Sequence, residues 1–312
     1  MPKTVTFEEI SFDYLLHLYL ENRVLRPSSE RNYRQITSAI QKDLRINYLQ
    51  EATKKRILKW RKDVLERSSA ITWNNYHTHM RALFNFAVEE HFLSENIFLQ
   101  VGKVQAPKLK KKIINVESVG ILLQTIQNHA EKFDPPFFWI AVFKTLFFTG
   151  MRQQQLLALK CKDIDFKKHQ IFLALESSKT HREWVIPMSA ACYDELWELR
   201  QRTLDLQGPV DITEHPVFHL QLFNANFSGF GLTRHQIEGF FKKLTKISGE
   251  PVSAHRLRHT MATLIAQSGD NPDLKSLQYI LGHTDIRTTM GYIEPKKEHL
   301  TRVLDKLSLT IK

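Results

Sequence analysis

A run of almost uninterrupted apolar residues, from Phe137 to Phe148, constrains the fold of this chain more than any other segment. A helix that is hydrophobic around its whole circumference is stable only in a membrane or in the core of a protein. The run is shorter than the roughly 18 apolar residues that a membrane-spanning helix needs, and Lys144 interrupts it. We therefore expect a central core helix and no membrane anchor.

The first hundred residues predict a compact all-helical unit. Apolar residues recur at helical spacing in four stretches that are separated by short links. Pro27, Ser28 and Ser29 are typical of a helix start, because proline fits the first turn and hydroxyl groups accept from its free N–H groups. The four predicted helices cover residues 7–23, 27–44, 51–66 and 71–91.

Residues 101–112 predict a linker between two domains. Gly102 and Pro107 break regular structure, and lysine occupies four of the last five positions. We therefore expect a helical domain over residues 1–100, a basic linker over residues 101–112 and a second domain over residues 113–312.

The second domain is predicted to be mainly helical with a small antiparallel sheet. Three short stretches alternate apolar and polar residues, as half-buried strands do, and a polar segment at residues 176–182 forms a hairpin tip between the last two. The predicted strands cover residues 164–166, 171–175 and 183–187, with another short strand near Val217 and Phe218. The predicted helices cover residues 117–130, 137–148, 190–202, 233–247, 254–267, 273–281 and 296–307, and another begins near Leu156.

The charge distribution predicts a polyanionic partner. The formal net charge is +11 and the pI is about 9.5, which favours nucleic acid or an anionic surface. Residues 1–112 contain 20 Lys and Arg against 12 Asp and Glu, whereas residues 113–312 contain 24 against 21. We therefore expect the first domain to bind DNA phosphates, with an ordinary solvated charged surface as the alternative. The candidate DNA contacts are Arg31, Arg34, Lys55, Lys59, Lys62, Trp73, Lys110 and Lys111.

The cysteine content and the N-terminus indicate the cytoplasm. Cys161 and Cys192 are too few for a disulfide framework or a four-ligand zinc site, and the N-terminus has no apolar signal core. His255 and His259 are spaced like a metal pair on one helix face, but no Glu lies between them and two neighbouring arginines would repel a cation. We expect a cytoplasmic, nucleoid-associated protein of prokaryotic type that needs no metal or other cofactor.

Several residues of the second domain suit the cleavage of a DNA phosphodiester without a metal. The transition state spreads negative charge over the non-bridging oxygens, and arginine suits this charge because its planar fork grips two oxygens and stays protonated. The reaction also needs an oxygen nucleophile, such as a tyrosine beside guanidinium groups, and an acid for the leaving 5′-hydroxyl. The candidate catalytic residues are Arg152, Lys179, His255, Arg258, His283 and Tyr292.

These residues lie in motifs that resemble those of the tyrosine recombinases, a family that includes phage integrases and Xer-type chromosome resolvases. The segment Thr-Gly-Met-Arg that ends at Arg152 resembles the motif of the first catalytic arginine, and the segment from Lys179 to Pro187 resembles the family's β-hairpin. The segment His-Arg-Leu-Arg-His that begins at His255 resembles the His-x-x-Arg box, and Leu-Gly-His ending at His283 resembles the next box. Tyr292 then falls where the family has its nucleophile.

The resemblance covers most of the chain and implies a site-specific recombinase or integrase. Such an enzyme cuts and rejoins DNA through a 3′-phosphotyrosine intermediate, without metal or ATP. Tyr292 would be the nucleophile and Lys179 the general acid. Arg152 and Arg258 would hold the phosphate oxygens.

The resemblance also implies an architecture and partners. A helical core-binding domain and a catalytic domain would close on DNA as a C-shaped clamp, and His255 and His283 would assist catalysis by hydrogen bonding. The partner would be a double-stranded recombination site, such as that of a mobile genetic element, on which a homotetramer joins two duplexes. The free chain would be a monomer or weak oligomer, and the helix at residues 296–307 would dock on a neighbouring protomer. Whether accessory proteins take part stays open.

One position departs from the family pattern. The family usually has an acidic residue three positions after the first arginine, and Gln155 stands there. An amide can orient a neighbour by hydrogen bonding but does not offset positive charge, so we expect reduced or retuned activity. Two alternatives therefore stay open: a DNA-binding accessory protein that has lost catalysis, and a type IB topoisomerase-like enzyme that religates the same duplex.

Overall fold

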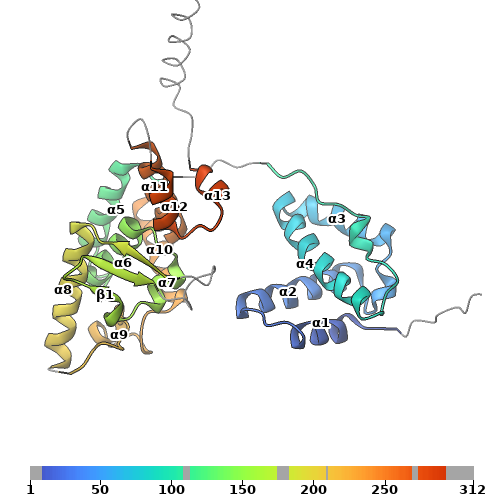
Figure 1. Cartoon of the computed structure of the whole chain (residues 1–312), viewed down its shortest axis with the longest axis horizontal. Helices are drawn as coiled ribbons and strands as arrows, with labels where there is room; N and C mark the ends of the chain where they lie inside the picture. Colours follow the sequence, from blue (N-terminus) through green and yellow to red (C-terminus); the bar gives the residue numbers. More distant parts are fainter. Residues whose placement is uncertain (1–8, 108–112, 174–182, 209, 269–272, 293–312) are drawn as a thin grey trace, which may run out of the picture. The chain divides into compact units, whose positions relative to one another are not determined.

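The computed structural model describes residues 9–107, 113–173, 183–208, 210–268 and 273–292 (Figure 1). Lys110, Lys111, Lys179 and the helix predicted at residues 296–307 lie outside these residues. The chain divides into two compact units, residues 1–110 and residues 111–312. Each unit has its own hydrophobic core.

The first unit is the predicted all-helical domain. Ser11, Thr53 and Ser69 each stand just before a helix and accept a hydrogen bond from a first-turn N–H group, and Pro27 occupies the first turn of another helix. The helices are α1 (Phe12–Glu21), α2 (Pro27–Leu44), α3 (Lys54–Arg67) and α4 (Ala70–Glu89), and short 3₁₀ turns lie at Leu49–Glu51 and Ile97–Leu99. The prediction of four helices with short links is confirmed.

The core of this unit corrects one predicted DNA contact. Trp73 is fully buried, its indole N–H donates to the carbonyl of Gly102 at 3.4 Å, and its ring packs edge-on against Trp60 with centroids 5.5 Å apart. Trp73 therefore belongs to the contact between α3 and α4, and the prediction that it contacts DNA was wrong. An aromatic residue that follows a cationic helix in the sequence suits a buried helix contact as well as a nucleic-acid surface, and the packing of α3 on α4 decides between them here.

The five predicted cationic contacts that the structure describes are exposed. They are Arg31, Arg34, Lys55, Lys59 and Lys62. Two of them have acidic partners one helical turn away, at 2.7 Å for Arg34 with Glu30 and 3.8 Å for Lys62 with Glu66. Such exposed pairs contribute little to stability.

The second unit is mainly helical, as predicted. Its helices are α5 (Val116–Asn128), α6 (Pro136–Thr149), α7 (Gln153–Ala158), α8 (Ala190–Gln207), α9 (Leu220–Phe223), α10 (Arg234–Ser248), α11 (Ala254–Gln267), α12 (Leu274–Leu281) and α13 (Ile286–Met290), with a 3₁₀ turn at Cys161–Asp163. The apolar helix α6 is central, as its sequence predicted, and packs against α5, α8 and α11 (Figure 1). Lys144 of α6 pairs with Glu195 of α8, so its charge has a partner in the half-buried contact. No described helix is both long and apolar enough to cross a membrane.

A three-stranded antiparallel sheet confirms the three predicted strands. Its order is β1 (Ile164–Asp165), β2 (Gln170–Leu173) and β3 (Trp184–Pro187). The expected strand near Val217 does not form. A single bridge joins Lys160 to Pro216 there, and the N–H of Val217 donates to the carbonyl of Leu159 at 2.9 Å. Pro216 has no N–H group to donate to a longer ladder.

The end of α6 requires a glycine. Gly150 has a φ of +59°, and a Cβ atom at this position would lie 1.8 Å from Cε of Met261 on α11. The left-handed conformation strains any other residue, and the added atom would displace Met261. The turn into the next segment, which begins with Arg152, therefore depends on Gly150.

We expect Gly150→Ala to lower the free energy of unfolding by about 1–3 kcal/mol, because it combines backbone strain with a displaced core side chain. Urea unfolding followed by circular dichroism measures the change. Gly120→Ala is the matched control, since a Cβ atom at Gly120 within α5 meets nothing within 4 Å and alanine favours a helix. Equal loss of stability in the two variants would contradict the structure at this turn.

Candidate active site

A buried arginine joins three segments of the second unit. Arg258 lies on α11 and is only 3% exposed. Its Nη1 donates to the carbonyl of Gly150 at 2.5 Å, and its Nη2 donates to the carbonyl of Leu281 at 2.7 Å. These carbonyls stand at the ends of α6 and α12, where carbonyl groups have no partner within the helix. The guanidinium therefore caps two helix ends and holds both against α11.

His283 contacts the same guanidinium. Its Nε2 lies 3.1 Å from Nη2 of Arg258, and its Nδ1 lies 2.9 Å from the hydroxyl oxygen of Thr289. A guanidinium has no acceptor, so Nε2 accepts from Arg258 and Nδ1 carries the proton that is donated to Thr289. This pair of bonds holds His283 as the neutral Nδ1–H tautomer.

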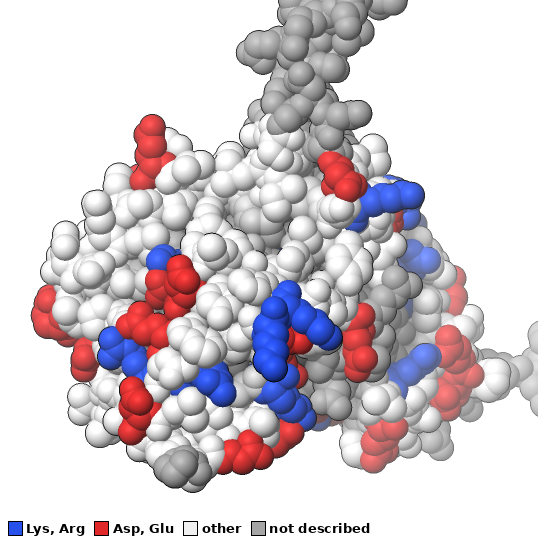
Figure 2. Space-filling model, turned by 60° about the vertical axis from the view of Figure 1, so that its left-hand side comes forward, with Lys and Arg blue, Asp and Glu red and all other residues white. Residues whose placement is uncertain are grey.

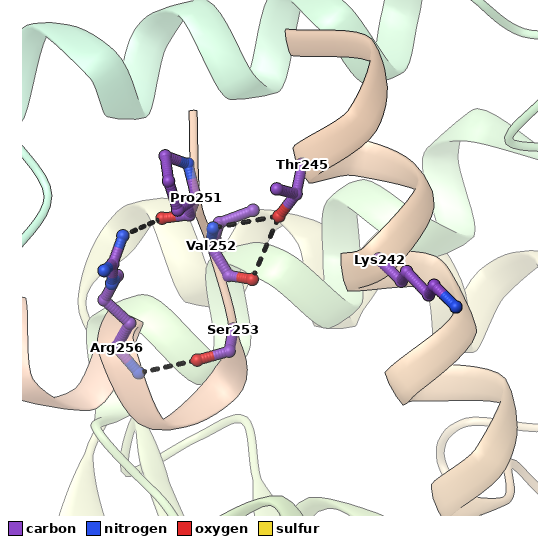
Figure 3. A pocket seen from close by; sticks show the side chains of 6 residues that line it. All are labelled: Lys242, Thr245, Pro251, Val252, Ser253 and Arg256. Carbon is purple, nitrogen blue, oxygen red and sulfur yellow. Dashed lines mark hydrogen bonds between the residues drawn. The ribbon is translucent and has the colours of Figure 1, made fainter. Parts of the chain in front are cut away.

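The loop before α11 fixes where that helix begins. Ser253 accepts from the N–H of Arg256 at 3.2 Å, and the hydroxyl of Thr245 bonds the N–H and the carbonyl of Val252 at 3.0 and 3.3 Å. These bonds surround a pocket of about 400 Å³ (Figure 3). Its two cationic side chains, Lys242 and Arg256, point away from each other in Figure 3. These hydrogen bonds therefore fix the start of α11. The two cationic side chains that line the pocket do not point toward a common site.

Arg152 follows the Gly150 turn and precedes α7. Its backbone N–H donates to Oε1 of Gln155 at 2.7 Å, which caps the first turn of α7. Burial lowers the pKa of the Arg152 guanidinium below its ordinary value, and the nearby Tyr292 acts in the opposite direction. Its Nη1 is buried and makes no hydrogen bond to any described residue. A buried donor of this kind suits an anionic ligand.

The side chain of Tyr292 lies close to both guanidinium groups. It is 4% exposed and belongs to a small cluster with Met261 and Leu277. Burial raises the pKa of its hydroxyl, whereas the charge of Arg258, a hydrogen bond with Arg258 and the charge of Arg152 lower it. The net shift is upward, so Tyr292 is protonated at neutral pH in the free protein.

His255 and His259 lie one helical turn apart on α11 and contact each other. Their Nε2 atoms are 2.6 Å apart, so one ring donates and the other accepts. The ring of His259 lies 5.3 Å from that of Tyr292, and the ring of His283 is stacked on Tyr292 at 6.1 Å. The exposed His255 is therefore connected to Tyr292 through His259.

The turn that carries His283 packs against the sheet. Gly282 has a φ of +60°, and a Cβ atom there would lie 2.5 Å from Cζ2 of Trp184, so only glycine fits against the indole. The N–H of Val185 donates to the hydroxyl of Tyr279 at 3.4 Å. These contacts hold β3 against the end of α12.

The structure brings most of the predicted catalytic residues together. Arg152, Arg258, His283 and Tyr292 interact directly, and His255 joins them through His259. Lys179 lies outside the described residues.

Sequence reasoning missed two residues of this cluster, His259 and Thr289. The four-residue spacing of His255 and His259 was a usable signal, because it places both rings on one helix face. Thr289 has no such signal, since its contact with His283 depends on how α13 packs against the turn that carries His283.

Charges of both signs share the surface of the second unit. Figure 2 shows Lys and Arg side chains standing beside Asp and Glu side chains on the face that it presents. Among the exposed pairs, Lys160 and Lys162 both contact Glu214, at 2.8 and 2.5 Å. Several exposed cations of the second unit thus have acidic neighbours, whereas no described Asp or Glu forms an ion pair with Arg152 or Arg258.

Comparison with known proteins gives a consistent result. The profile of the phage integrase family matches residues 120–299. Two proteins named tyrosine recombinase XerC, from Pseudomonas aeruginosa and Pseudomonas syringae, are each 28% identical over 304 and 315 residues. The matches cover 93% and 97% of this chain and 70% and 64% of those proteins. The chain thus spans about two thirds of the length of these relatives.

Two solved structures share the fold. A Tn1549 transposon integrase in complex with transposon right end DNA matches with a TM-score of 0.73 at 19% identity, over 96% of this chain and 100% of that chain. A lambda integrase tetramer bound to a Holliday junction matches with a TM-score of 0.68 at 20% identity, over 88% of this chain and 78% of that chain.

We expect ¹⁵N NMR of the histidine side chains to show His283 protonated at Nδ1 and unprotonated at Nε2 at neutral pH. Thr289→Val keeps the shape of the buried side chain but removes the acceptor of the Nδ1–H group, so it should shift the Nδ1 resonance and lower the stability by about 1–3 kcal/mol, while Arg258 keeps Nε2 unprotonated. Thr288→Val, at an exposed position, is the control and should leave the spectrum unchanged. A wild-type His283 that is protonated at Nε2 would contradict the assigned bonds.

Proposed function

The chain belongs to the phage integrase family of tyrosine recombinases, enzymes that cut and rejoin DNA at specific sites, and we propose that it does so through a covalent bond between Tyr292 and DNA. The observation that carries the proposal is that Tyr292 has a hydrogen bond with Arg258 and that the charges of Arg258 and Arg152 both lower the pKa of its hydroxyl. Two cations beside one buried tyrosine form a site for a phosphodiester and for the oxygen that attacks it.

The proposed reaction has two transesterification steps. The Tyr292 oxygen attacks the scissile phosphorus, its proton is lost, and the bond from phosphorus to the 5′ oxygen breaks. The 5′ oxygen leaves as a hydroxyl after taking a proton from Lys179, and the 3′ phosphate stays on Tyr292. The 5′-hydroxyl of a partner duplex then attacks this phosphotyrosine and releases Tyr292. One phosphoester bond forms for each that breaks, so the sequence of steps needs no ATP.

The two arginines have different roles in this proposal. Arg258 is held by two carbonyl groups and by His283, so it presents a fixed charge to the phosphate. Arg152 has a buried Nη1 without a hydrogen-bond partner among the described residues, and this nitrogen supplies a donor for a non-bridging oxygen. Fixed donors of this kind stabilise the charge that develops in the transition state without reorganisation.

The histidines assist in the same proposal. His283 orients Arg258 through its Nε2. His255 and His259 form a hydrogen-bonded pair. The ring of His259 lies beside the ring of Tyr292, and His255 is exposed. We assign to this pair the transfer of protons between Tyr292 and solvent, because imidazole exchanges protons near neutral pH.

We also propose that the partner is a double-stranded recombination site that is held by the first unit. α3 begins with Lys54, Lys55 and Arg56 and has no acidic residue in its first turn, so the helix dipole and the side chains attract anions at the same end. Lys55 and Lys59 make no ion pair with any described residue. We propose further that four copies of the chain join two duplexes, by analogy with the lambda integrase tetramer on a Holliday junction.

We expect replacement of Lys55 and Lys59 by alanine to weaken DNA binding and to reduce the slope of log affinity against log salt by about 1–2, because each lost phosphate contact removes about 0.9 from that slope. Fluorescence anisotropy at several salt concentrations measures both quantities. Lys162→Ala is the control, since Lys162 is paired with Glu214 in the second unit. An unchanged slope in the double variant would remove these lysines from the DNA interface.

The nucleophile can be tested with a nicked suicide duplex that carries the recombination site. We expect the wild-type protein to form a covalent adduct on a denaturing gel and Tyr292→Phe to lose it by at least about a thousandfold, since no oxygen is left to attack. Tyr193→Phe is the control for loss of a phenol elsewhere in the second unit. Absence of an adduct in the wild type would favour a DNA-binding accessory protein. Relaxation of supercoiled DNA without strand exchange would favour a topoisomerase-like enzyme.

A further inference from the structure

The segment that follows the 3₁₀ turn at Ile97–Leu99 is bound to α4. Val101 is 1% exposed and belongs to the core of the first unit. Asn74 of α4 bonds both backbone groups of Val104, since its Nδ2 donates to the carbonyl at 2.9 Å and its Oδ1 accepts from the N–H at 2.9 Å. One side chain thereby satisfies both backbone groups of a residue, as a neighbouring strand would. The chain is therefore attached to the first unit as far as Val104.

The chain is attached again where the second unit begins. Ile114 is 4% exposed, and its backbone N–H donates to the hydroxyl oxygen of Thr260 on α11 at 2.9 Å. The Thr260 hydroxyl donates in turn to the carbonyl of Arg256 at 2.9 Å, so its proton and a lone pair are both used. Thr260 is fully buried and lies two positions after Arg258 on the same helix. The second attachment is therefore on the helix that carries a proposed phosphate-binding arginine.

The two attachments leave nine residues, 105–113, to join the units. Upstream of Val104, the indole N–H of Trp73 holds the carbonyl of Gly102. Loss of the Asn74 bonds would therefore add residues 103 and 104 to the connection. Two residues of extended chain span roughly 7 Å, whereas the phosphates of one DNA strand follow each other at about 3.4 Å along the helix axis. The Asn74 attachment thus controls a length of chain that corresponds to about two base pairs.

We propose that Asn74 and Thr260 are positioning residues that fix how many residues join the two units, and that this length restricts which phosphate Tyr292 attacks. The inference rests on the proposed function, in which the first unit holds the duplex and Tyr292 of the second unit cuts it. The effective concentration of a linked module at its site depends on linker length, and it falls once the linker is longer than the span requires. A fixed length therefore favours one phosphate over its neighbours along the strand.

Hydrogen exchange of single backbone amides, followed by NMR, tests the two attachments in the DNA-free protein. We expect Asn74→Ala to speed exchange of the Val104 amide about three- to tenfold and to leave that of Ile114 unchanged, because a hydrogen bond contributes a factor of this size. Thr260→Val should do the reverse, since valine has the shape of threonine without its hydroxyl. Asn75→Ala is the matched control, because it makes the same change at an exposed neighbouring position of α4. It should change neither amide.

The second measurement maps the phosphates at which the suicide duplex is cut. We expect Asn74→Ala to raise the share of adducts at the neighbouring phosphates at least about threefold, because the released residues span more than the step between phosphates. The total rate of adduct formation at saturating duplex should stay within about twofold of wild type, since the site around Tyr292 is unchanged. A merely destabilised protein would lose rate without spreading its adducts. Asn75→Ala should give the wild-type map.

A Gly-Ser insertion after Pro107 is the second variant, because it lengthens the same connection by two residues and leaves both attachments intact. It should spread the adducts as Asn74→Ala does and leave both amides at their wild-type exchange rates. Rapid exchange of the Val104 and Ile114 amides in the wild type would overturn the inference, as would an unchanged adduct map in either lengthened protein. If the wild type forms no adduct, the proposed function fails, and the exchange rates still decide whether both ends of the connection are attached.

Discussion

The hydrogen bonds of the Arg258 guanidinium are the interaction on which the second unit depends. They join the end of α6, the end of α12 and His283, three segments that are far apart in the sequence. The carbonyl groups that bind Arg258 belong to helix ends, so the protein stabilises a buried cation with dipoles that would otherwise lack partners. The same bonds leave the guanidinium charge without a carboxylate among the described residues. Arg258 is thus both a structural link and the main source of positive charge at Tyr292.

The positive charges of the site lower the stability of the DNA-free protein. The buried Arg258 and the half-buried Arg152 repel each other, and burial opposes ionisation of Tyr292. A phosphodiester would supply the missing negative charge, so binding of DNA and stability of the second unit are coupled.

Local patterns in the sequence predicted most of the elements and named most of the residues that the structure brings together around Tyr292. Apolar spacing located the helices, and the apolar run from Phe137 to Phe148 correctly predicted a central helix, because a helix without a polar face has no other place in this fold. The motif around Arg258 identified a catalytic candidate, but nothing in it showed that the guanidinium caps two helix ends. Trp73 was misassigned because composition does not distinguish a buried helix contact from an exposed one. The contacts of His259, Thr289 and Gln155 depend on how α7, α11 and α13 pack, which no local pattern encodes.

We propose that the arginine pair directs one particular tyrosine, Tyr292, to DNA. The most direct measurement is mass spectrometry of peptides from the wild-type covalent adduct, after nuclease trimming of the DNA. We expect a nucleotide joined through its 3′ phosphate to the peptide that contains Tyr292. A nucleotide on Tyr279, which is 55% exposed in the same region of the chain, or a link through a 5′ phosphate would contradict it.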